Sequence, residues 1–226
     1  MKCDLCPRKC LVDRKKGEKG ICGQTENLKV ARAALHFWEE PCISGDAGSG
    51  AVFFSGCPLH CVFCQNENIA NGTVGKEISL ERLVDIFLEL QEKRANNINL
   101  VTPGHFVPQI VKALDQARKE GLTLPVVYNT SSYETVDTIK MLEGYVDIYL
   151  PDFKYMSPVL SKKYSHAPDY AEVAKAAIAE MVRQTGKAVF VNGEEDNLIL
   201  SGTIVRHLTL PGCMADSMLC MKLTEI

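Results

Sequence analysis

The residues best suited to chemistry in this chain are three cysteines, Cys57, Cys61 and Cys64, which are spaced C-x3-C-x2-C. They follow the apolar run at 51–54, so the pattern predicts a short loop at the end of a strand. Thiolates are soft ligands that hold zinc or iron–sulfur clusters. Clusters that only transfer electrons are normally closed by four cysteines, so three thiolates leave one iron of a four-iron cluster open to another ligand.

Two other interpretations of this loop are open. The three thiols can belong to a zinc site that borrows His60 or His105 as its fourth ligand, or they can be buried reduced thiols. Tight cysteine spacing in a chain of cytosolic character indicates metal or redox chemistry more often than packing. We therefore favour a [4Fe-4S] cluster bound by the loop.

A second group of cysteines, Cys3, Cys6, Cys10 and Cys22, has the spacing C-x2-C-x3-C-x11-C. The surrounding segment has little apolar material, so a metal would supply stability that packing does not. Four thiolates suit zinc and a second iron–sulfur cluster equally well, and simple reduced thiols are the alternative. The remaining cysteines have no ligand spacing and are expected to be buried or incidental thiols: Cys42, Cys213 and Cys220.

The bulk composition bounds the function class. The chain has 226 residues, of which 46% are hydrophobic, and this favours one sizeable core with small attachments. The net charge of −3 is dispersed, so no nucleic-acid or membrane partner is expected. The sequence shows no signal-peptide pattern and no membrane-spanning apolar stretch, which predicts a cytoplasmic protein. Ten cysteines in a reducing compartment are poorly explained by disulfides.

Beyond residue 47 the pattern alternates short apolar runs with helix-like segments, which is typical of strand–helix units around a parallel sheet. The predicted strands lie at 51–55, 98–101, 124–128, 146–150 and 203–208. The predicted helices lie at 79–90, 107–120, 133–142 and 170–184. A hairpin is also predicted, in which residues 189–192 pair with 198–207 across a turn at 193–197.

The cysteine loop, with Phe63 just before its last cysteine, resembles the signature loop of the radical S-adenosylmethionine (SAM) enzymes. The segments 48–66, 97–108, 125–133 and 147–155 resemble proteins related to the pyruvate formate-lyase activating enzyme, and the likeness extends over residues 30–212. It implies an α/β fold, a partial (β/α) TIM-like barrel of radical SAM type. Active sites of such barrels lie at the carboxyl ends of the strands, where the cysteine loop is predicted to be.

This resemblance suggests a division of the chain. We predict that residues 1–47 are the four-cysteine segment with its lead-in and that residues 48–226 are the partial barrel. Relatives continue past the Pro-Gly turn at 211–212 with a further strand–helix unit, so the barrel is expected to be truncated at its C-terminus.

The resemblance also implies the chemistry. SAM would bind the open iron, and one electron would break its bond from sulfur to ribose carbon, giving methionine and a 5′-deoxyadenosyl radical that abstracts hydrogen. The implied partners are a low-potential electron donor of flavodoxin or ferredoxin type and a protein substrate, with activation of a glycyl radical enzyme as the expected reaction.

Several SAM-binding residues are implied by position within the family pattern. Phe63 would neighbour the adenine, although an aromatic plug is an equal interpretation. Asn129 and Ser131 follow the third predicted strand and would meet the ribose hydroxyls, whereas turn formation is the alternative. Relatives carry Gly-Gly-Glu after the second predicted strand to meet the SAM amino group. This chain has Thr102-Pro103-Gly104 instead, which leaves only Thr102 for that contact.

Three charged residues complete the implied site. Asp152 and Lys154 match the family's Asp-x-Lys after the fourth predicted strand, and a surface ion pair is the alternative. Arg206 would clamp the SAM carboxylate through two parallel hydrogen bonds. Two competing functions remain open at this point: a metal-binding or electron-transfer protein on a degenerate radical SAM frame, and a radical enzyme that acts on a small molecule.

Overall fold

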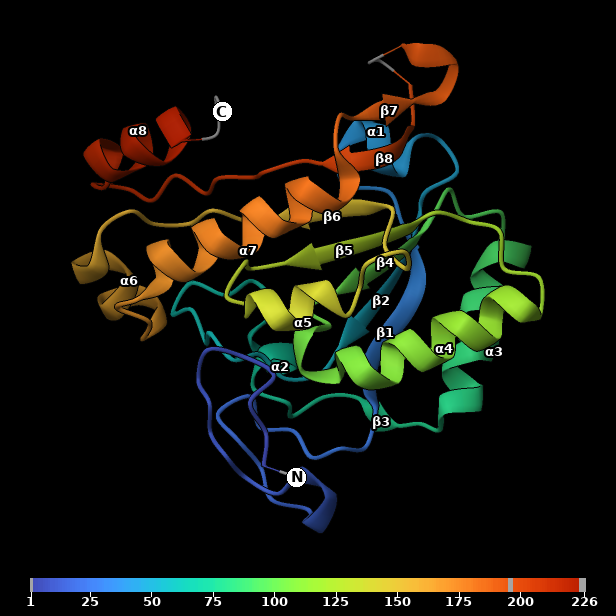
Figure 1. Ribbon diagram of the computed structural model, residues 1–226, viewed down its shortest axis with the longest axis horizontal. Coiled ribbons are helices and arrows are strands. Elements are labelled where there is room, and N and C mark those ends of the chain that lie inside the picture. The colour runs from blue at the N-terminus through green and yellow to red at the C-terminus, as the bar shows by residue number, and fades with distance from the viewer. Residues whose placement is uncertain (1, 195–196, 224–226) are drawn as a thin grey trace.

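In the computed structural model, residues 2–194 and 197–223 are described, and they contain one eight-stranded sheet flanked by helices (Figure 1). Its strand order is β3-β1-β2-β4-β5-β6-β8-β7. The neighbours from β2 to β8 are parallel, whereas β1, β3 and β7 pair antiparallel toward the edges. The strands are β1 (Lys29–His36), β2 (Ser49–Phe54), β3 (Lys76–Glu77), β4 (Ile98–Val101), β5 (Val126–Thr130), β6 (Ile148–Pro151), β7 (Val189–Phe190) and β8 (Ile199–Thr203).

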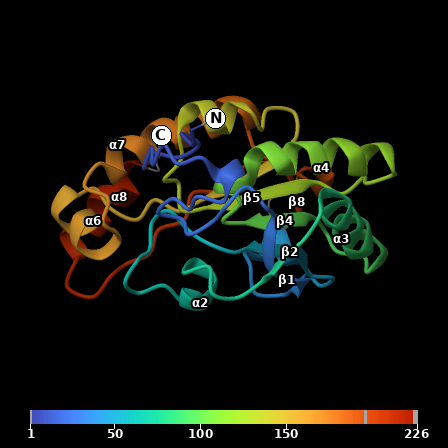
Figure 2. The same ribbon diagram turned by 90° about the horizontal axis from the view of Figure 1, so that it is seen from below.

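The larger helices cover one face of the sheet, which Figure 2 shows for α4, α5 and α7. The helices are α1 (Pro41–Ser44), α2 (Glu67–Ala70), α3 (Leu80–Glu92), α4 (Val107–Lys119), α5 (Val136–Lys140), α6 (Pro158–Ser165), α7 (Tyr170–Thr185) and α8 (Met214–Leu223). Three 3-10 turns are η1 (Arg14–Lys16), η2 (Gly104–Phe106) and η3 (Val191–Gly193). This arrangement confirms the predicted α/β class and is consistent with a radical SAM partial barrel.

The main core lies between this helix layer and the sheet. On α3, the predicted apolar stripe is buried, including Leu83, Phe87 and Leu90. Ser79 begins the helix as its N-cap, because its side chain accepts a hydrogen bond from the backbone N–H of Arg82 at 3.1 Å. A cap of this kind contributes about 1 kcal/mol to stability. The stripe therefore holds α3 against the sheet, as its spacing predicts.

The other face of the sheet is covered by the segment between β1 and β2. Ile43 of α1 packs there with Val127 and Ile148. Asn97, directly before β4, holds this segment in place. Its side-chain nitrogen donates to the Ile43 carbonyl at 2.8 Å, and its side-chain oxygen accepts from the Ser49 hydroxyl at 2.6 Å. Residues 37–48 therefore lie across this second face of the parallel strands. We call it the inner face, and Ile43, Val127 and Ile148 form its apolar cluster.

Two predicted strands begin too early. The predicted segment 124–128 contains Pro125, which has no N–H to donate. β5 therefore begins directly after this proline, at Val126. The predicted strand at 146–150 is observed as 148–151, because Asp147 turns back so that its carboxylate accepts from the Val126 N–H at 2.8 Å. These shifts move the strand ends toward Thr130 and Pro151, and so toward the predicted site.

The last predicted strand, at 203–208, is wrong in its position. β8 covers Ile199–Thr203, because the antiparallel pairing of Phe190 with Ile199 and the burial of Ile199 in the inner core hold this earlier segment in the sheet. The predicted hairpin is thus observed in a shorter form, with η3 following β7. Residues 195–196 of its predicted turn lie outside the described residues. Beyond β8, the N–H groups of Ile204 and Arg206 donate to the Tyr149 and Pro151 carbonyls of β6, and an isolated bridge joins Asp152 to Arg206.

The predicted helix at 133–142 is reduced to α5, which begins after Thr135. The chain makes a tight turn first, in which Ser132 adopts a left-handed conformation with φ of 64° and its carbonyl accepts from Glu134 N–H. Thr135 then caps α5 by accepting from the Thr138 N–H at 3.2 Å. The turn directs Tyr133 and Glu134 into buried positions that a helix would not give them.

β1 was missed by the sequence analysis because a β-bulge breaks its alternation. Leu28 and Val30 are buried on one face, the register with β2 shifts between Val30 and Arg32, and Ala33 and Leu35 then continue the same face. One inserted residue therefore hides the period of two. Since β1 pairs with β2, the predicted lead-in contributes a strand to the sheet, while the division at residue 47 stays a prediction.

None of the helices within residues 2–194 and 197–223 is long and apolar enough to cross a membrane.

A buried carboxyl group gives the fold a testable pH dependence. Glu134 is 5% exposed, and its Oε1 accepts from the hydroxyl groups of Thr130 at 2.8 Å and Tyr128 at 3.3 Å. Burial raises the pKa of Glu134 to about 7 from 4.5, against the lowering effect of both hydrogen bonds. Its contribution to stability is therefore fully present below pH 4.5 and is lost as the pH rises through 7.

We predict that Glu134→Gln flattens this dependence, because a neutral amide has no proton to lose. Between pH 4.5 and 8 the wild type should lose up to about 3 kcal/mol of unfolding free energy more than the variant. Urea unfolding at both pH values measures the difference. Glu92→Gln, at an exposed position on α3, is the matched control and should follow the wild type. Equal pH slopes for wild type and Glu134→Gln would contradict the prediction.

Candidate active site

The three-cysteine loop lies between β2 and α2, at the carboxyl edge of the parallel strands. Cys57, Cys61 and Cys64 are partly exposed, and they lie close enough together for each other's charge to raise the pKa of Cys57. Burial is the main cause that raises the pKa of the Cys57 thiol to about 11, while a hydrogen bond from the Leu59 N–H, at 3.4 Å from Sγ, lowers it. The loop thus gathers the three thiols at the predicted edge.

Two groups favour the anionic form of Cys61. Burial raises the pKa of this thiol, and the Lys154 ammonium and the Ser165 hydroxyl act in the opposite direction. Ser165 donates to Cys61 Sγ at 3.0 Å and also shares a 2.8 Å hydrogen bond with the Tyr155 hydroxyl. Because a thiolate and not a thiol is the metal ligand, this surrounding suits metal binding.

The number and type of the donors suit a cluster. Among residues 2–194 and 197–223, no three His, Cys, Asp or Glu side chains converge tightly enough to bind one metal ion. A four-iron cluster is larger than an ion, and its thiolates attach at separate irons. Cys57, Cys61 and Cys64 would occupy three of these four irons.

The proposed fourth zinc ligands are engaged elsewhere. His60 has Nε2 at 2.8 Å from the Ile21 carbonyl oxygen and Nδ1 at 3.2 Å from the Asn71 side-chain oxygen. His105 is buried, and its Nε2 donates to the Ser55 carbonyl at 2.7 Å. Burial lowers the pKa of His105 to about 4, so it is neutral. Both histidines thus serve packing and loop connections, and the zinc interpretation of the loop has no support from them.

A pair of cations surrounds one carboxylate beside the loop. Lys154 Nζ is 2.6 Å from Asp152 Oδ2, and Arg206 Nε is 2.9 Å from Asp152 Oδ1. The side chains of Lys154 and Asp152 are only 12% and 23% exposed, so this is no surface ion pair. Burial alone would lower the pKa of Lys154, but the Asp152 carboxylate and the Cys61 thiolate more than offset it and the pKa is raised. Lys154 is therefore a fixed positive charge beside Cys61.

Arg206 connects this carboxylate to two further elements. Its NH1 is 3.2 Å from Glu39 Oε2, and its NH2 donates to the Asn129 side-chain oxygen at 2.7 Å. With Asp152 on Nε, each guanidinium nitrogen already has a protein acceptor. In this arrangement Arg206 joins the loop after β1 to the ends of β5 and β6. To bind a ligand carboxylate as well, Arg206 must use its remaining N–H groups or release one of its present acceptors.

Glu39 and Glu40 were missed by the sequence analysis. Glu39 accepts from the Asn129 amide at 3.3 Å, and burial raises its pKa to about 7, although Arg206 lowers it. Glu40 Oε1 lies 3.7 Å from Arg206 NH1. The sequence does show two adjacent glutamates directly before Pro41. Nothing in their spacing predicts that Glu39 contacts Asn129, which is 90 positions further along the chain.

Two buried polar groups fit a site that takes a polar ligand. Asn99 is fully buried in β4 on the same face as Val127, and neither its amide nitrogen nor its oxygen has a hydrogen-bond partner within the described residues. Glu40 Oε2 is likewise buried without a hydrogen-bond partner there. Since buried polar groups are normally paired, the Asn99 amide and the Glu40 carboxylate are candidates for hydrogen bonds to a polar ligand.

The other predicted residues lie around the same edge. Phe63 packs in the apolar cluster below the loop, with its ring centroid 6.5 Å from that of Tyr164, which supports its interpretation as an aromatic plug. Ser131 is half-buried, and its carbonyl accepts from the Tyr170 hydroxyl. Thr102 directly follows β4 with φ of 55°, a strained conformation for a β-branched residue and typical of functional sites.

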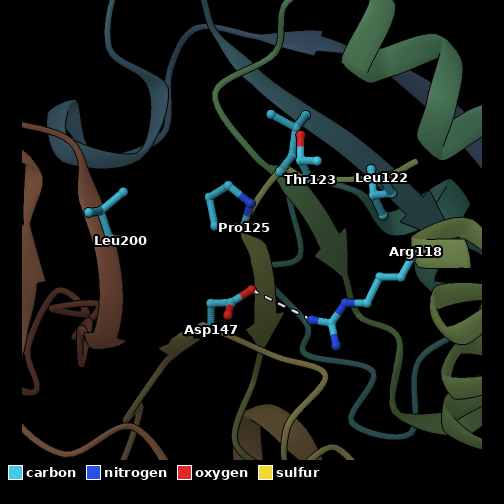
Figure 3. Close-up of a pocket in the computed structure, with 7 residues that line it drawn as sticks. Arg118, Leu122, Thr123, Pro125, Asp147 and Leu200 are labelled. Carbon is cyan, nitrogen blue, oxygen red and sulfur yellow. Dashed lines mark ion pairs between the residues drawn. The ribbon is translucent and has the colours of Figure 1, made fainter.

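A pocket at the start of β5 lies away from these residues (Figure 3). It has a volume of about 500 Å³ and surrounds the start of β5, where Arg118 and Asp147 form an ion pair at 4.0 Å. Arg118 also donates to the Gly144 and Tyr145 carbonyls. Its polar groups thus hold the loop between α5 and β6. We place the active site at the opposite edge, because the three cysteines and the ion pairs of Asp152 with Lys154 and Arg206 lie there.

Comparison with known proteins identifies a family for this chain. A family model described as the radical SAM superfamily matches residues 51–197, nearly two thirds of the chain, and includes the cysteine loop, Asp152 and Lys154. An uncharacterized protein of Methanocaldococcus jannaschii is 28% identical over 215 residues. The match covers 92% of this chain and 57% of that relative, so the chain spans little more than half of the relative's length.

The contact between Ser165 and Cys61 can be tested in metal-free protein. We predict that Ser165→Ala raises the pKa of the Cys61 thiol, because the anion loses a hydrogen-bond donor. The midpoint of the pH profile for alkylation of Cys61 by iodoacetamide, followed by mass spectrometry, should move upward, with a rate at pH 8 about two- to fivefold lower. Ser161→Ala, on the same helix and bonded only to Pro158, should leave the midpoint in place. A midpoint unchanged by Ser165→Ala would refute the contact.

Proposed function

This chain belongs to the radical SAM superfamily, and we propose that it uses one [4Fe-4S] cluster, held by Cys57, Cys61 and Cys64, to cleave SAM reductively. The observation that carries the proposal is the placement of the three thiols at the carboxyl edge of a parallel sheet, beside an ordered group of cations and carboxylates. When bound, the cluster and SAM supply a 5′-deoxyadenosyl radical that removes one hydrogen atom from the substrate.

The chain's own residues would hold and orient SAM. Lys154 lies beside Cys61 and supplies positive charge where the SAM carboxylate would approach the loop. Asn129 and Ser131, at the end of β5, are the candidates for the ribose hydroxyls. Glu39 and Glu40 add carboxylates that suit the SAM amino group, for which relatives use a glutamate that is absent after β4. These contacts rest on position and charge.

The electron balance requires an external donor. Reductive cleavage of one SAM would consume one electron, and the products would be methionine, 5′-deoxyadenosine and a substrate that has lost one hydrogen atom. We propose a cytoplasmic low-potential protein of flavodoxin or ferredoxin type as the donor.

For the hydrogen donor we propose a glycine Cα–H in a protein partner. The support is the resemblance to activating enzymes together with Trp38, which is 89% exposed next to Glu39 and so presents an aromatic contact surface at the site. A small-molecule substrate is the rival. Deuterium transfer from a glycine-labelled protein partner into 5′-deoxyadenosine would support the proposal, whereas transfer from a metabolite fraction alone would contradict it.

The first test is cleavage of SAM under anaerobic conditions. Reconstituted and reduced wild type should form 5′-deoxyadenosine, and Cys61→Ala should lose the product, because two thiolates do not retain the cluster. Cys42→Ala is the matched control and should keep both cluster and product. An intact cluster in the wild type without product would reject the proposal and favour the alternative of a metal-binding or electron-transfer protein.

Substitution of Arg206 tests whether the group of Asp152, Lys154, Arg206 and Glu39 orders the SAM-binding site. We predict that Arg206→Lys weakens SAM binding to the reconstituted cluster about tenfold, because lysine keeps the charge but does not hold Asp152, Glu39 and Asn129 together. Titration followed by the change in the cluster's electron paramagnetic resonance spectrum measures this affinity. Arg183→Lys, in an exposed ion pair with Glu143, should bind as the wild type does. Unchanged affinity in Arg206→Lys would exclude this role.

A further inference from the structure

The N-terminal segment is built around its cysteines. Within residues 2–28 the only helix or strand is the short turn η1. Cys6 and Cys22 are 9% and 7% exposed, whereas the apolar side chains of Leu11 and Ile21 are 52% and 50% exposed. Leu28 packs into the main core of the sheet, and none of the described core clusters is built from residues 2–27, so this part of the chain has no hydrophobic core of its own.

The four thiols share one environment. Cys3 donates to the Val12 carbonyl at 2.9 Å and accepts at its own carbonyl from Leu11, which brings it beside Cys10, and Cys10 Sγ accepts from the N–H of Ile21, directly before Cys22. Burial is the largest cause that raises the pKa of Cys6 and of Cys22, and smaller contributions come from Glu134 at Cys6 and from the neighbouring cysteines at both. The folded segment therefore gathers all four members of the C-x2-C-x3-C-x11-C pattern.

Backbone amides are already arranged for thiolates. Cys6 accepts a hydrogen bond from the backbone of Arg8, and Cys22 accepts one from Gln24, so in each case the donor is two residues further along the chain. Cys57 of the cluster loop has the same relation to Leu59. Hydrogen bonds to the sulfurs are among the features by which a protein tunes an iron–sulfur site.

Cys10 is accommodated in a similar way. The Ile21 N–H donates to Cys10 Sγ at 3.3 Å. Gly20 gives the sulfur its space, because a Cβ at this position would lie only 3.1 Å from it.

This segment is fastened to the cluster loop. Arg8 donates from Nε to the Pro58 carbonyl at 2.9 Å, from NH1 to His166 at 2.6 Å and from NH2 to Ser165 at 3.1 Å. Its guanidinium also lies over the Tyr133 ring, 5.1 Å from the centroid. One side chain, located between Cys6 and Cys10, thus holds both the loop and the residue that donates to Cys61.

A second connection runs in the opposite direction. His60, between Cys57 and Cys61, contacts the Ile21 carbonyl next to Cys22 at 2.8 Å. The backbones also approach closely, since a Cβ on Gly56 would lie 2.4 Å from the Cys22 carbonyl oxygen. The two cysteine groups therefore share an interface.

We propose that Cys3, Cys6, Cys10 and Cys22 bind a single thiolate-held metal centre and that this centre holds the segment in the shape that supports the cluster loop. The segment depends on the metal for its order, and the loop depends on the segment through Arg8 and His60. Four thiolates complete the coordination of a zinc ion or of a four-iron cluster. An iron–sulfur cluster and zinc share the ligand chemistry, and the experiment separates them.

The proposal is tested by metal analysis of the triple variant Cys57→Ala/Cys61→Ala/Cys64→Ala, in which the loop holds no cluster. Anaerobically purified protein, expressed with iron and zinc available, should carry about four irons with matching sulfide, or about one zinc, per chain. Either result supports the proposal and identifies the centre. The variant in which Cys3, Cys6, Cys10 and Cys22 are all alanine should lose that quantity of metal. A folded triple variant without metal would overturn the proposal.

If the triple variant does not fold, cysteine alkylation in the wild type decides the question. Metal-loaded protein should protect Cys3, Cys6, Cys10 and Cys22 from iodoacetamide, and chelation should expose them. Modification of these four at the same rate before and after chelation would also overturn the proposal. Neither measurement uses SAM cleavage, so the result is independent of the proposed reaction.

The support of the loop is measured by hydrogen exchange. Arg8→Gln should leave the metal in the four-cysteine site but make the amides of residues 57–64 exchange about tenfold faster, because three hydrogen bonds to the loop and α6 are lost. Arg32→Gln, at an exposed position on β1, should exchange as the wild type does. Chelation of the triple variant should accelerate exchange in the same residues. Unchanged exchange in both cases would show that the segment does not support the loop.

Discussion

The Asp152 carboxylate, held between Lys154 and Arg206, is the interaction on which the arrangement of this site depends. A partly buried charge is costly unless it is paired, and here two cations from different positions meet on one carboxylate. Lys154 extends the group toward Cys61, and Arg206 extends it toward Glu39 and Asn129. The loops that follow β1, β2, β5, β6 and β8 are thereby brought to one place.

This electrostatic group lies on an apolar base. Leu59, Phe153, Tyr155 and Tyr170 are buried together beneath the cysteine loop, with Cys57, Cys61 and Phe63 packed against them. Such surroundings raise the pKa of the thiols through burial, and the Lys154 ammonium and the Ser165 hydroxyl counter that effect at Cys61. The same combination, burial with a few aimed donors, recurs at Cys6 and Cys22 in the N-terminal segment, which contacts the loop through Arg8 and His60.

Local patterns in the chain predicted most of the elements, and their errors have physical causes. The stripe on α3 and the strand at 98–101 are as expected because each depends on nearby residues alone. β5 begins after Pro125 and not at residue 124. β1 was not predicted because a bulge between Val30 and Arg32 breaks its alternation, and the last strand is 199–203 and not 203–208 because it pairs with β7. Each error arises where pairing with a distant segment outweighs local preference.

For the site, spacing alone determined the number and softness of the ligands, because C-x3-C-x2-C and C-x2-C-x3-C-x11-C place thiols within short loops in any fold. It also indicated Asp152, Lys154 and Arg206 as residues that follow strands. Only the tertiary structure decided that Glu39 reaches Arg206 across 167 positions, that Asn99 is buried without a hydrogen-bond partner among the described residues, and that Arg8 joins the two cysteine groups. Those contacts come from sheet order and loop packing, which join residues that no local period relates.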